Sequence, residues 1–509
     1  MVCGSGCSRI FPLTDMPNIS KTSFLQYLQC HKLFWTATNH SEQIPWLPRQ
    51  LDKLRQEEGR LVEKYAHVLF QDATQIIKDI PLKEIIAQSK EAVLRPIINR
   101  PIFNSIIQAQ DLIAEIDILL PLEDGAFDLL EVKSSTDIKD HFLPDIAFQH
   151  HVLTSAGLKI HSCYLLTLNN KYVRKGEIEP KKLFSHHDVT AAVENISQEI
   201  GHQISSAKEI MLKEQCPDVP IGAHCDSPYE CPMKEVCWKK INDCPNNIFT
   251  LNRLRQKDAW ALCNQGIILS QDIPVNIKLM PRQRLQIECE KTGQIHVDKK
   301  GVKECLDRLV MPLYFLDFET VAPAIPWIDG MKSYSALPFQ FSLHGMDKLD
   351  EAPWHISWIW DGKGDDVWLE MLTELERWLG KKGSIIAYNA AFEKNVLKMA
   401  VKLHPEFQDW LDGVLERFVD LLVPFRNFQV YHPGQHGSAS LKAVLPPWTG
   451  ESYGNLEIQN GELAGWAFRR MRASKDEEEI EGIQKELEKY CGLDTFGMVL
   501  LLRKLRRLI

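Results

Sequence analysis

Residues 314–320 read YFLDFET, an apolar run that carries two carboxylates two positions apart. Side chains alternate between the two faces of a β-strand, so a strand here places Asp317 and Glu319 on one face and Phe318 on the other. Two buried like charges are costly unless a cation pairs with them, and Mg²⁺ and Mn²⁺ prefer carboxylate oxygens. The stretch therefore predicts either a metal site or a strand end whose acids reach solvent.

Two later segments place further polar residues in apolar surroundings. SIIAYNAAFEKNVLKMA predicts a strand, then Asn389, then a helix that carries Glu393. LEKYCGLDTFGMVLLL predicts a helix in which Tyr490 and Asp494 are four positions apart and therefore share a face. On its own, this last pair is also what a core tyrosine with a chance acidic neighbour produces.

In this order and context, the three segments resemble the motifs of the DEDD exonucleases of the DnaQ-like, RNase H-like superfamily. The tyrosine four positions before the last aspartate is typical of the DEDDy branch. The resemblance implies an α/β domain and a 3′–5′ exonuclease that releases nucleoside 5′-monophosphates. It implies two Mg²⁺ or Mn²⁺ ions held by four carboxylates, namely Asp317, Glu319, Glu393 and Asp494. It also implies that Tyr490 orients the attacking water and that Asn389 lies beside the substrate. Position 393 is Glu where the superfamily has Asp, so the spacing or choice of metal can differ here.

A second set of charged residues lies in AEIDILLPLEDGAFDLLEVKSST, residues 114–136, which predicts two strands joined by a polar turn. Asp117 lies on the first strand, and Glu131 and Lys133 lie two apart on the second, hence on one face. Carboxylates can hold a metal, and a lysine beside them can activate water or stabilise developing charge. The arrangement resembles the PD-(D/E)XK nucleases. It implies a second, restriction-endonuclease-like α/β domain with Mg²⁺ or Mn²⁺ on Asp117 and Glu131.

Two flanking segments resemble the RecB-like branch of those nucleases. EEGRLVEKYAHVLF places Glu63 on a predicted helix, where that branch has a histidine or an acid. DIAFQHHVLTSAG places Gln149 at the predicted start of a helix, with Leu153 where the branch has an aromatic residue. The resemblance implies that Glu63 is a further metal ligand and that Gln149 supports the site. An ordinary acid on an amphipathic helix is the alternative for Glu63.

Cysteines gather in CDSPYECPMKEVCW, residues 225–238. This group follows an early cysteine, Cys30, in a predicted helix over 20–36, and the combination resembles the iron–sulfur RecB-like nucleases. The resemblance implies a structural 4Fe–4S cluster, because thiolates suit iron, with the ligands Cys30, Cys225, Cys231 and Cys237. The alternative is a zinc site, although spacers of five and six residues are wider than usual zinc pairs, with the ligands Cys225, Cys231, Cys237 and Cys244. Scattered cysteines such as Cys491 are predicted to be small buried hydrophobic residues.

The chain has 509 residues, 44% of them hydrophobic and 25% charged, with a formal net charge of −9. This composition predicts a cytoplasmic globular protein of two or three domains, and it argues against a nucleic-acid coat protein held by charge alone. No apolar run is long enough for a membrane helix, so no membrane partner is expected. The predicted parts are a tail at 1–16, a RecB-like domain at 17–247, a helical module at 248–306 and a DEDDy domain at 307–509.

The whole pattern resembles a bacterial family that fuses an iron–sulfur RecB-like nuclease domain to a DEDDy exonuclease domain. The resemblance implies a metal-dependent nuclease that acts on single-stranded or end-exposed DNA or RNA. The alternative is a nucleic-acid-binding protein in which only one domain is catalytic and the other binds or guides the strand.

Overall fold

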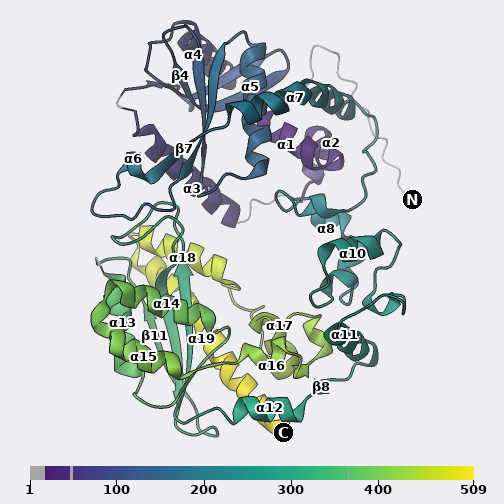
Figure 1. The fold of residues 1–509 in the computed structure, drawn as a ribbon, viewed down its shortest axis with the longest axis vertical. Helices are drawn as coiled ribbons and strands as arrows, with labels where there is room; N and C mark the ends of the chain where they lie inside the picture. The colour runs from purple at the N-terminus through teal and green to yellow at the C-terminus, as the bar shows by residue number, and fades with distance from the viewer. Residues whose placement is uncertain (1–17, 46–49, 71, 365) are drawn as a thin grey trace.

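The computed structural model describes residues 18–45, 50–70, 72–364 and 366–509, so the predicted tail at 1–16 lies outside the described residues. Figure 1 shows one sheet with its helices at the top of the view and a second sheet with its own helices at the bottom. The prediction of a mixed α/β, multidomain chain is confirmed at this level.

The upper sheet has seven strands. They are β1 (Ile19–Ser20), β2 (Thr74–Gln75), β3 (Ile102–Ala109), β4 (Leu112–Pro121), β5 (Phe127–Lys133), β6 (Ile160–Leu168) and β7 (Phe184–Asp188). Six of them run in the order β2-β3-β4-β5-β6-β7, and β1 pairs with β4. β3, β4 and β5 pair antiparallel, whereas β5 and β6 are parallel. The two strands predicted within 114–136 are confirmed as the β4–β5 hairpin.

Helices cover both faces of the upper sheet. They are α1 (Lys21–Gln29), α2 (His31–Asn39), α3 (Gln50–His67), α4 (Leu82–Leu94), α5 (Leu143–Ser155), α6 (Pro180–Leu183) and α7 (Thr190–Met211). Leu129 packs with residues of α5 and α7, and the next residue, Leu130, packs with Val62 and Ala66 of α3. Because neighbouring residues of a strand point to opposite faces, α5 and α3 lie on opposite sides of the sheet.

The helix predicted over 20–36 is in fact two helices that meet at Cys30. This residue has an extended backbone, with φ −161° and ψ 120°, and it separates α1 from α2. Phe24 in α1 and Phe34 in α2 are both fully buried. The apolar pattern continues across the break and no glycine or proline marks it, so the sequence shows no interruption.

The lower sheet has five strands in the order β11-β10-β9-β12-β13. They are β9 (Leu313–Val321), β10 (Leu337–Met346), β11 (Trp354–Ile359), β12 (Ser384–Ala387) and β13 (Phe418–Asp420). β9, β10 and β11 are antiparallel, and β12 is parallel to both β9 and β13. The stretch 314–320 is therefore the middle strand of a sheet.

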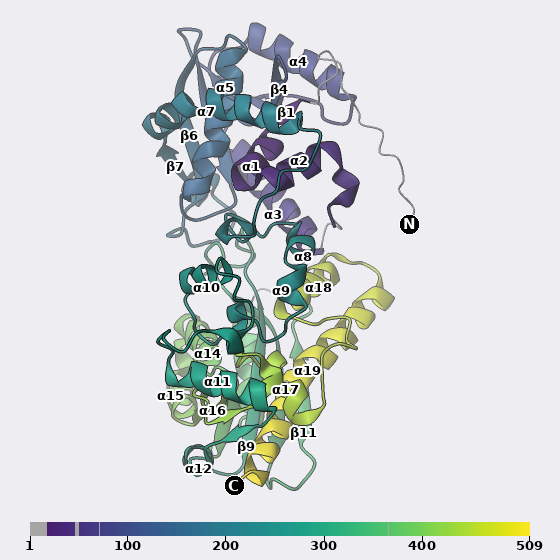
Figure 2. The same ribbon diagram turned by 90° about the vertical axis from the view of Figure 1, so that its right-hand side faces the viewer.

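Seven helices accompany this sheet in the described residues. They are α13 (Val367–Trp378), α14 (Ala391–Leu403), α15 (Gln408–Glu416), α16 (Leu422–Arg426), α17 (Leu441–Thr449), α18 (Gly461–Ala473) and α19 (Glu477–Arg507). Figures 1 and 2 show the sheet between α13 and α14 on one side and α19 on the other. α19 contains the helix predicted for LEKYCGLDTFGMVLLL and lies against β9 and β10.

Short helices join the two sheets and run along the right-hand side of Figure 1. They are α8 (Lys234–Cys237), α9 (Lys239–Asn242), α10 (Gln256–Cys263), α11 (Pro281–Thr292) and α12 (Lys299–Leu306). β8 (His296–Val297) between them pairs with β14 (Val430–Tyr431). The stretch predicted as a helical module, 248–306, contains α10, α11 and α12. Among the described residues, no helix is long and apolar enough to cross a membrane.

The two sheet-bearing parts contact each other directly. α3 of the upper part lies against α18 of the lower part, and Glu58 forms an ion pair with Arg469 at 2.9 Å. The Tyr334 hydroxyl donates a hydrogen bond to the carbonyl of Ser134 at 2.8 Å, one residue beyond β5. These contacts fix the position of the upper part relative to the lower part.

Candidate active sites

The acids predicted in the C-terminal part converge on one cleft. Asp317 and Glu319 lie on β9, Glu393 lies in the first turn of α14, and Tyr490 and Asp494 lie one turn apart on α19. Glu319, Glu393 and Asp494 are 8%, 2% and 6% exposed. Three elements far apart in sequence therefore bring four carboxylates and one phenol to a single place.

Asn389 lies at the rim of the same cleft. It has a left-handed backbone with φ 79°, a conformation that asparagine adopts more readily than most residues. Its N–H donates a hydrogen bond to Asp420 Oδ1 at 3.0 Å, and Asp420 also accepts from the N–H of Leu422 at 3.0 Å. Asp420 therefore shapes the turn between β12 and α14.

Burial opposes ionisation of these acids. It raises the pKa of Glu319 to about 8, with Asp494 adding to the effect, and raises the pKa of Glu393 to about 8. Burial also raises the pKa of Asp494 to about 6. The pKa of Asp317 is raised well above its usual range, first by burial and then by the charge of Asp494. The cluster is unfavourable when fully ionised unless a cation joins it.

A divalent cation fits this cluster. Among the described residues, none of the four carboxylates forms an ion pair within 4.0 Å, and Glu393 Oε2 is buried without a hydrogen-bond partner. Buried carboxylate oxygens of this kind are the donors that Mg²⁺ and Mn²⁺ take. The donor set therefore matches the metal site predicted from sequence.

Three residues that sequence reasoning left out of the site complete it. Cys491 was predicted to be a plain buried residue, but its thiol lies 3.5 Å from Asp317 Oδ2. Potential ligand atoms of Asp317, Glu319 and Cys491 all lie within 4.8 Å of one another. The Lys442 ammonium donates to the Tyr490 hydroxyl at 3.1 Å, and the Tyr453 hydroxyl donates to Asp494 Oδ1 at 2.5 Å.

Without a divalent cation, the stability of the C-terminal part is expected to fall with rising pH. Glu319 and Glu393 have an ordinary pKa of 4.5 and a folded-state pKa of about 8. Between these values the folded state binds more protons than the unfolded state, so the free energy of unfolding decreases as the pH rises. A cation removes this cost, so the rise in Tm caused by Mn²⁺ should be larger at about pH 8 than at about pH 6. Thermal denaturation at the two pH values tests this, and equal rises would contradict metal binding by these carboxylates.

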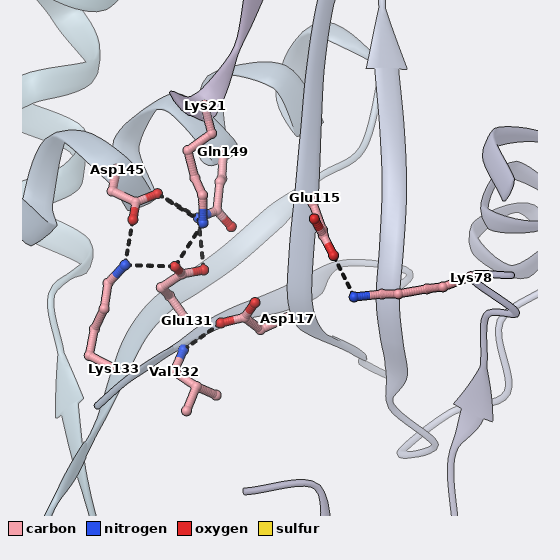
Figure 3. A network of polar contacts seen from close by, with 9 residues as sticks. All are labelled: Lys21, Lys78, Glu115, Asp117, Glu131, Val132, Lys133, Asp145 and Gln149. Atoms are coloured by element: carbon pink, nitrogen blue, oxygen red, sulfur yellow. Dashed lines mark hydrogen bonds and ion pairs between the residues drawn. The ribbon is translucent and has the colours of Figure 1, made fainter. Parts of the chain in front are cut away.

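The second predicted site is a network of ion pairs in the upper part, shown in Figure 3. Glu131 Oε1 accepts from Lys133 at 2.8 Å and from Lys21 at 3.0 Å, and Glu131 Oε2 accepts from the Gln149 amide at 2.8 Å. Asp145 joins the same network through Lys133, through Lys21 at 3.4 Å and through Gln149 at 3.0 Å. Two lysines therefore face two carboxylates.

Lys21 and Asp145 were missed by the sequence analysis. Lys21 is the first residue of α1, and 110 positions separate it from Glu131. Asp145 lies four positions before Gln149 on α5, so both side chains share a helix face. Gln149 was predicted at the start of a helix and lies in its middle instead, because α5 begins at Leu143.

Two further predicted residues lie beside the network. Asp117 Oδ2 accepts from the N–H of Val132 at 2.8 Å, and burial together with the charge of Glu131 raises its pKa well above the usual range. Glu63 on α3 lies 3.6 Å from His67 Nε2 and not within the ion-pair network. The structure thus brings together Asp117, Glu131, Lys133 and Gln149. Glu63 lies outside this group of residues.

This network is neutralised by the protein itself. Burial opposes ionisation of Glu131, but Lys133 and Lys21 outweigh it and hold the pKa of Glu131 well below its usual range. Both Glu131 oxygens already accept hydrogen bonds. In this arrangement the residues do not present an open pair of carboxylates to a divalent cation, in contrast to the C-terminal cleft.

Replacing Lys133 with Met is expected to lower the free energy of unfolding by about 3 kcal/mol, because it leaves two buried carboxylates with one cation fewer. The Lys133 and Glu131 side chains are 15% and 2% exposed. The matched control is Lys159→Met, since the Lys159–Asp124 pair is 68% and 53% exposed and should contribute less than about 1 kcal/mol.

Urea denaturation of both variants gives the comparison. The difference should shrink as the pH falls below the ordinary Glu131 pKa of 4.5, since a carboxyl with a depressed pKa contributes stability above that value and loses it in acid. Equal effects of the two substitutions at neutral pH would show that the network does not stabilise the fold.

Four cysteines line a common hollow between α1, α2 and α8, namely Cys30, Cys225, Cys231 and Cys237. Burial raises the pKa of the Cys231 thiol to about 11, and the charges of Cys30, Cys225 and Cys237 add to the shift. Cys244 does not line this hollow. The fold therefore gathers the set predicted for an iron–sulfur cluster rather than the alternative set.

The spacing of the thiols bears on the metal. Two sulfur ligands of one zinc ion lie at most about 4.6 Å apart, because each Zn–S bond is about 2.3 Å. Among the described residues, no three cysteine sulfurs all lie within 4.8 Å of one another.

Comparison with known proteins gives one family. Residues 314–440 match the model of a family described as a domain of unknown function, DUF2779. The matched segment contains Asp317, Glu319, Asn389 and Glu393 and ends before Tyr490 and Asp494. No curated protein matches the chain. The description assigns no activity.

Proposed function

We propose that the C-terminal part is an RNase H-like domain of the DEDDy type that removes nucleotides from the 3′ end of DNA or RNA. The proposal rests on one observation above others: four carboxylates from β9, α14 and α19, three of them buried, share a cleft, and none of them has an ion pair within 4.0 Å among the described residues. Such a site suits two Mg²⁺ or Mn²⁺ ions held by Asp317, Glu319, Glu393 and Asp494. When bound, these ions would supply an activated water and stabilise charge on the leaving oxygen.

The chain's own residues supply the other parts of the chemistry. The pKa of Tyr490 is raised first by burial and then by the charge of Asp494, so its hydroxyl keeps its proton at neutral pH. That hydroxyl can hold the attacking water in line, while Lys442 fixes its orientation by donating to its oxygen. The Lys442 ammonium also lines the cleft, where it could stabilise charge on a phosphate. Tyr453 holds the Asp494 carboxylate in place.

End-labelled single strands test this proposal. Wild-type protein with Mn²⁺ should shorten a 5′-labelled DNA or RNA strand stepwise, and EDTA should stop the shortening. A 3′-labelled strand should lose its label in the first step as a nucleoside 5′-monophosphate. Internal cutting alone, or trimming from the 5′ end, would refute the assignment.

A second candidate function concerns the upper part, which we propose to be a RecB-like, PD-(D/E)XK domain. The neutralised Glu131 favours a role in binding or guiding the strand over metal-dependent cleavage, because both of its carboxylate oxygens already accept hydrogen bonds from lysine or glutamine. The rival proposal is a second nuclease with Mg²⁺ or Mn²⁺ on Asp117 and Glu131 and with Lys133 activating water. Cleavage that survives Asp317→Asn and disappears with Lys133→Met would favour that rival.

We further propose that Cys30, Cys225, Cys231 and Cys237 hold a structural 4Fe–4S cluster. The cluster would join the α1–α2 break to the segment before α8, which are nearly 200 positions apart in sequence. It would stabilise the upper part rather than react.

A further inference from the structure

A pocket next to the ion-pair network extends beyond both candidate sites. It is walled by α1, by the segment that leads into α5, and by the loop between Cys225 and Cys231. Its lining includes Lys133 and Asp145 from the network and Tyr229 from the loop. The pocket measures about 980 Å³ including its open mouth. It therefore opens directly beside the charged groups of the network.

The loop that carries Tyr229 is held in place by several contacts. The Gln29 amide donates to the carbonyl of His224 at 2.9 Å and to the carbonyl of Tyr229 at 2.7 Å. His141 Nε2 and the Tyr229 hydroxyl are hydrogen-bonded at 3.0 Å, and their rings meet edge to face with centroids 5.1 Å apart. Although it is fixed in this way, Tyr229 is 61% exposed. An ordered aromatic ring with a free face is thus available at the pocket.

Cations and a second aromatic ring surround the same space. Lys133 Nζ lies 5.3 Å and Lys139 Nζ 6.0 Å from the centroid of the Phe142 ring. Leu25 and Pro144 add apolar walls. Burial, with help from Lys139 and Lys133, lowers the pKa of His141, so its imidazole is neutral at neutral pH. The walls are flat and apolar, and the positive charge lies at one edge.

We propose that this pocket binds an unstacked nucleobase of a single-stranded nucleic acid, with Tyr229 as the stacking surface and the adjoining phosphate at the exposed Lys139. Proteins that hold single strands combine aromatic rings for the bases with lysines or arginines for the backbone, and stacking tolerates every base. An uncharged peptide or an acyl chain would use the apolar walls but would gain nothing from the lysine at the edge. The inference rests on the proposed function only in that the protein acts on nucleic acid.

Binding without cleavage tests the inference. Every protein tested carries Asp317→Asn, and no divalent metal is added, so that strand trimming does not interfere. Fluorescence anisotropy measures the Kd for oligothymidylate, for oligouridylate and for an abasic oligomer of the same length and charge. The parent protein should bind a strand with bases more tightly than the abasic oligomer. Tyr229→Ala should weaken binding to the strand with bases by about 5- to 100-fold and leave the Kd for the abasic oligomer unchanged.

Two further variants separate stacking from folding. Tyr229→Phe keeps the ring and Tyr229→Trp enlarges it, so both should bind within about threefold of the parent protein. An unchanged Tm for Tyr229→Ala shows that the loop between the cysteines is intact. Equal affinities of the parent protein and Tyr229→Ala for the strand with bases, or no preference over the abasic oligomer, would overturn the inference. The trimming assay with Mn²⁺ is scored separately, so failure of the exonuclease proposal leaves this test valid.

Discussion

Asp317→Asn is expected to reduce the release of nucleotides from a 3′ end by at least about a thousandfold. Asp317 lies in the middle of the cleft, where its carboxylate approaches Glu319 and Cys491 within 4.8 Å. The amide has the same shape but carries no charge, so it cannot hold a divalent cation in the way that the carboxylate does. Single-turnover trimming of a 5′-labelled strand with Mn²⁺ measures the effect.

The same substitution should stabilise the protein when no divalent metal is present. Burial and the charges of Asp494, Glu319 and Glu393 all oppose ionisation of Asp317, so removing its charge relieves repulsion. If the site is built to hold a cation, Asp317→Asn should have a higher Tm and no activity. The higher Tm would exclude unfolding as the cause of the lost activity. The control is Asp350→Asn, an exposed acid of the same part, which should change neither quantity. Normal trimming by Asp317→Asn would rule out the proposed site.

Cys231→Ser is expected to remove bound iron and to lower the Tm of the upper part by about 10 °C or more. Cys231 is 6% exposed and lies among the other three thiols of the hollow. Wild-type protein prepared without oxygen should be brown and should bleach with dithionite, because iron–sulfur thiolates absorb visible light and zinc thiolates do not. Metal analysis, absorption and thermal denaturation measure the change.

Two other cysteines serve as controls for that substitution. Cys216 is exposed, and Cys244 belongs only to the alternative zinc set, so serine at either position should leave the iron in place. A colourless wild-type protein with one zinc per chain, lost in Cys244→Ser, would contradict the cluster and support the zinc alternative.

Local periodicity accounts for the parts of the structure that sequence predicted well. Asp317 and Glu319 share a face because strand side chains alternate, and Tyr490 and Asp494 share a face because they are four apart on a helix. Both patterns are set by backbone geometry within a few residues. The order of these motifs along the chain then suggested that the strand face and the helix face meet. In the structure the four residues do line one cleft.

Long-range contacts account for what sequence did not predict. The sequence around Lys21 does not indicate that its ammonium will reach Glu131, 110 positions away. The contact depends on how α1 packs on the sheet. Cys491 has the sequence setting of a core residue, and only the approach of α19 to β9 places its thiol at Asp317. Likewise, the break between α1 and α2 at Cys30 follows from packing, and no glycine or proline in the sequence marks it. Such features depend on tertiary contacts that a single sequence does not display.

Product analysis with the Lys133→Met protein isolates the C-terminal site from any chemistry at the ion-pair network. The protein is incubated with a short unlabelled single strand and Mn²⁺, and mass spectrometry identifies what is released over time. Metal-dependent 3′–5′ exonuclease activity predicts nucleoside 5′-monophosphates, released one at a time from the 3′ end and absent when Asp317→Asn is added to the same protein. Release of nucleoside 3′-monophosphates, or equal release by the Asp317→Asn protein, would contradict it.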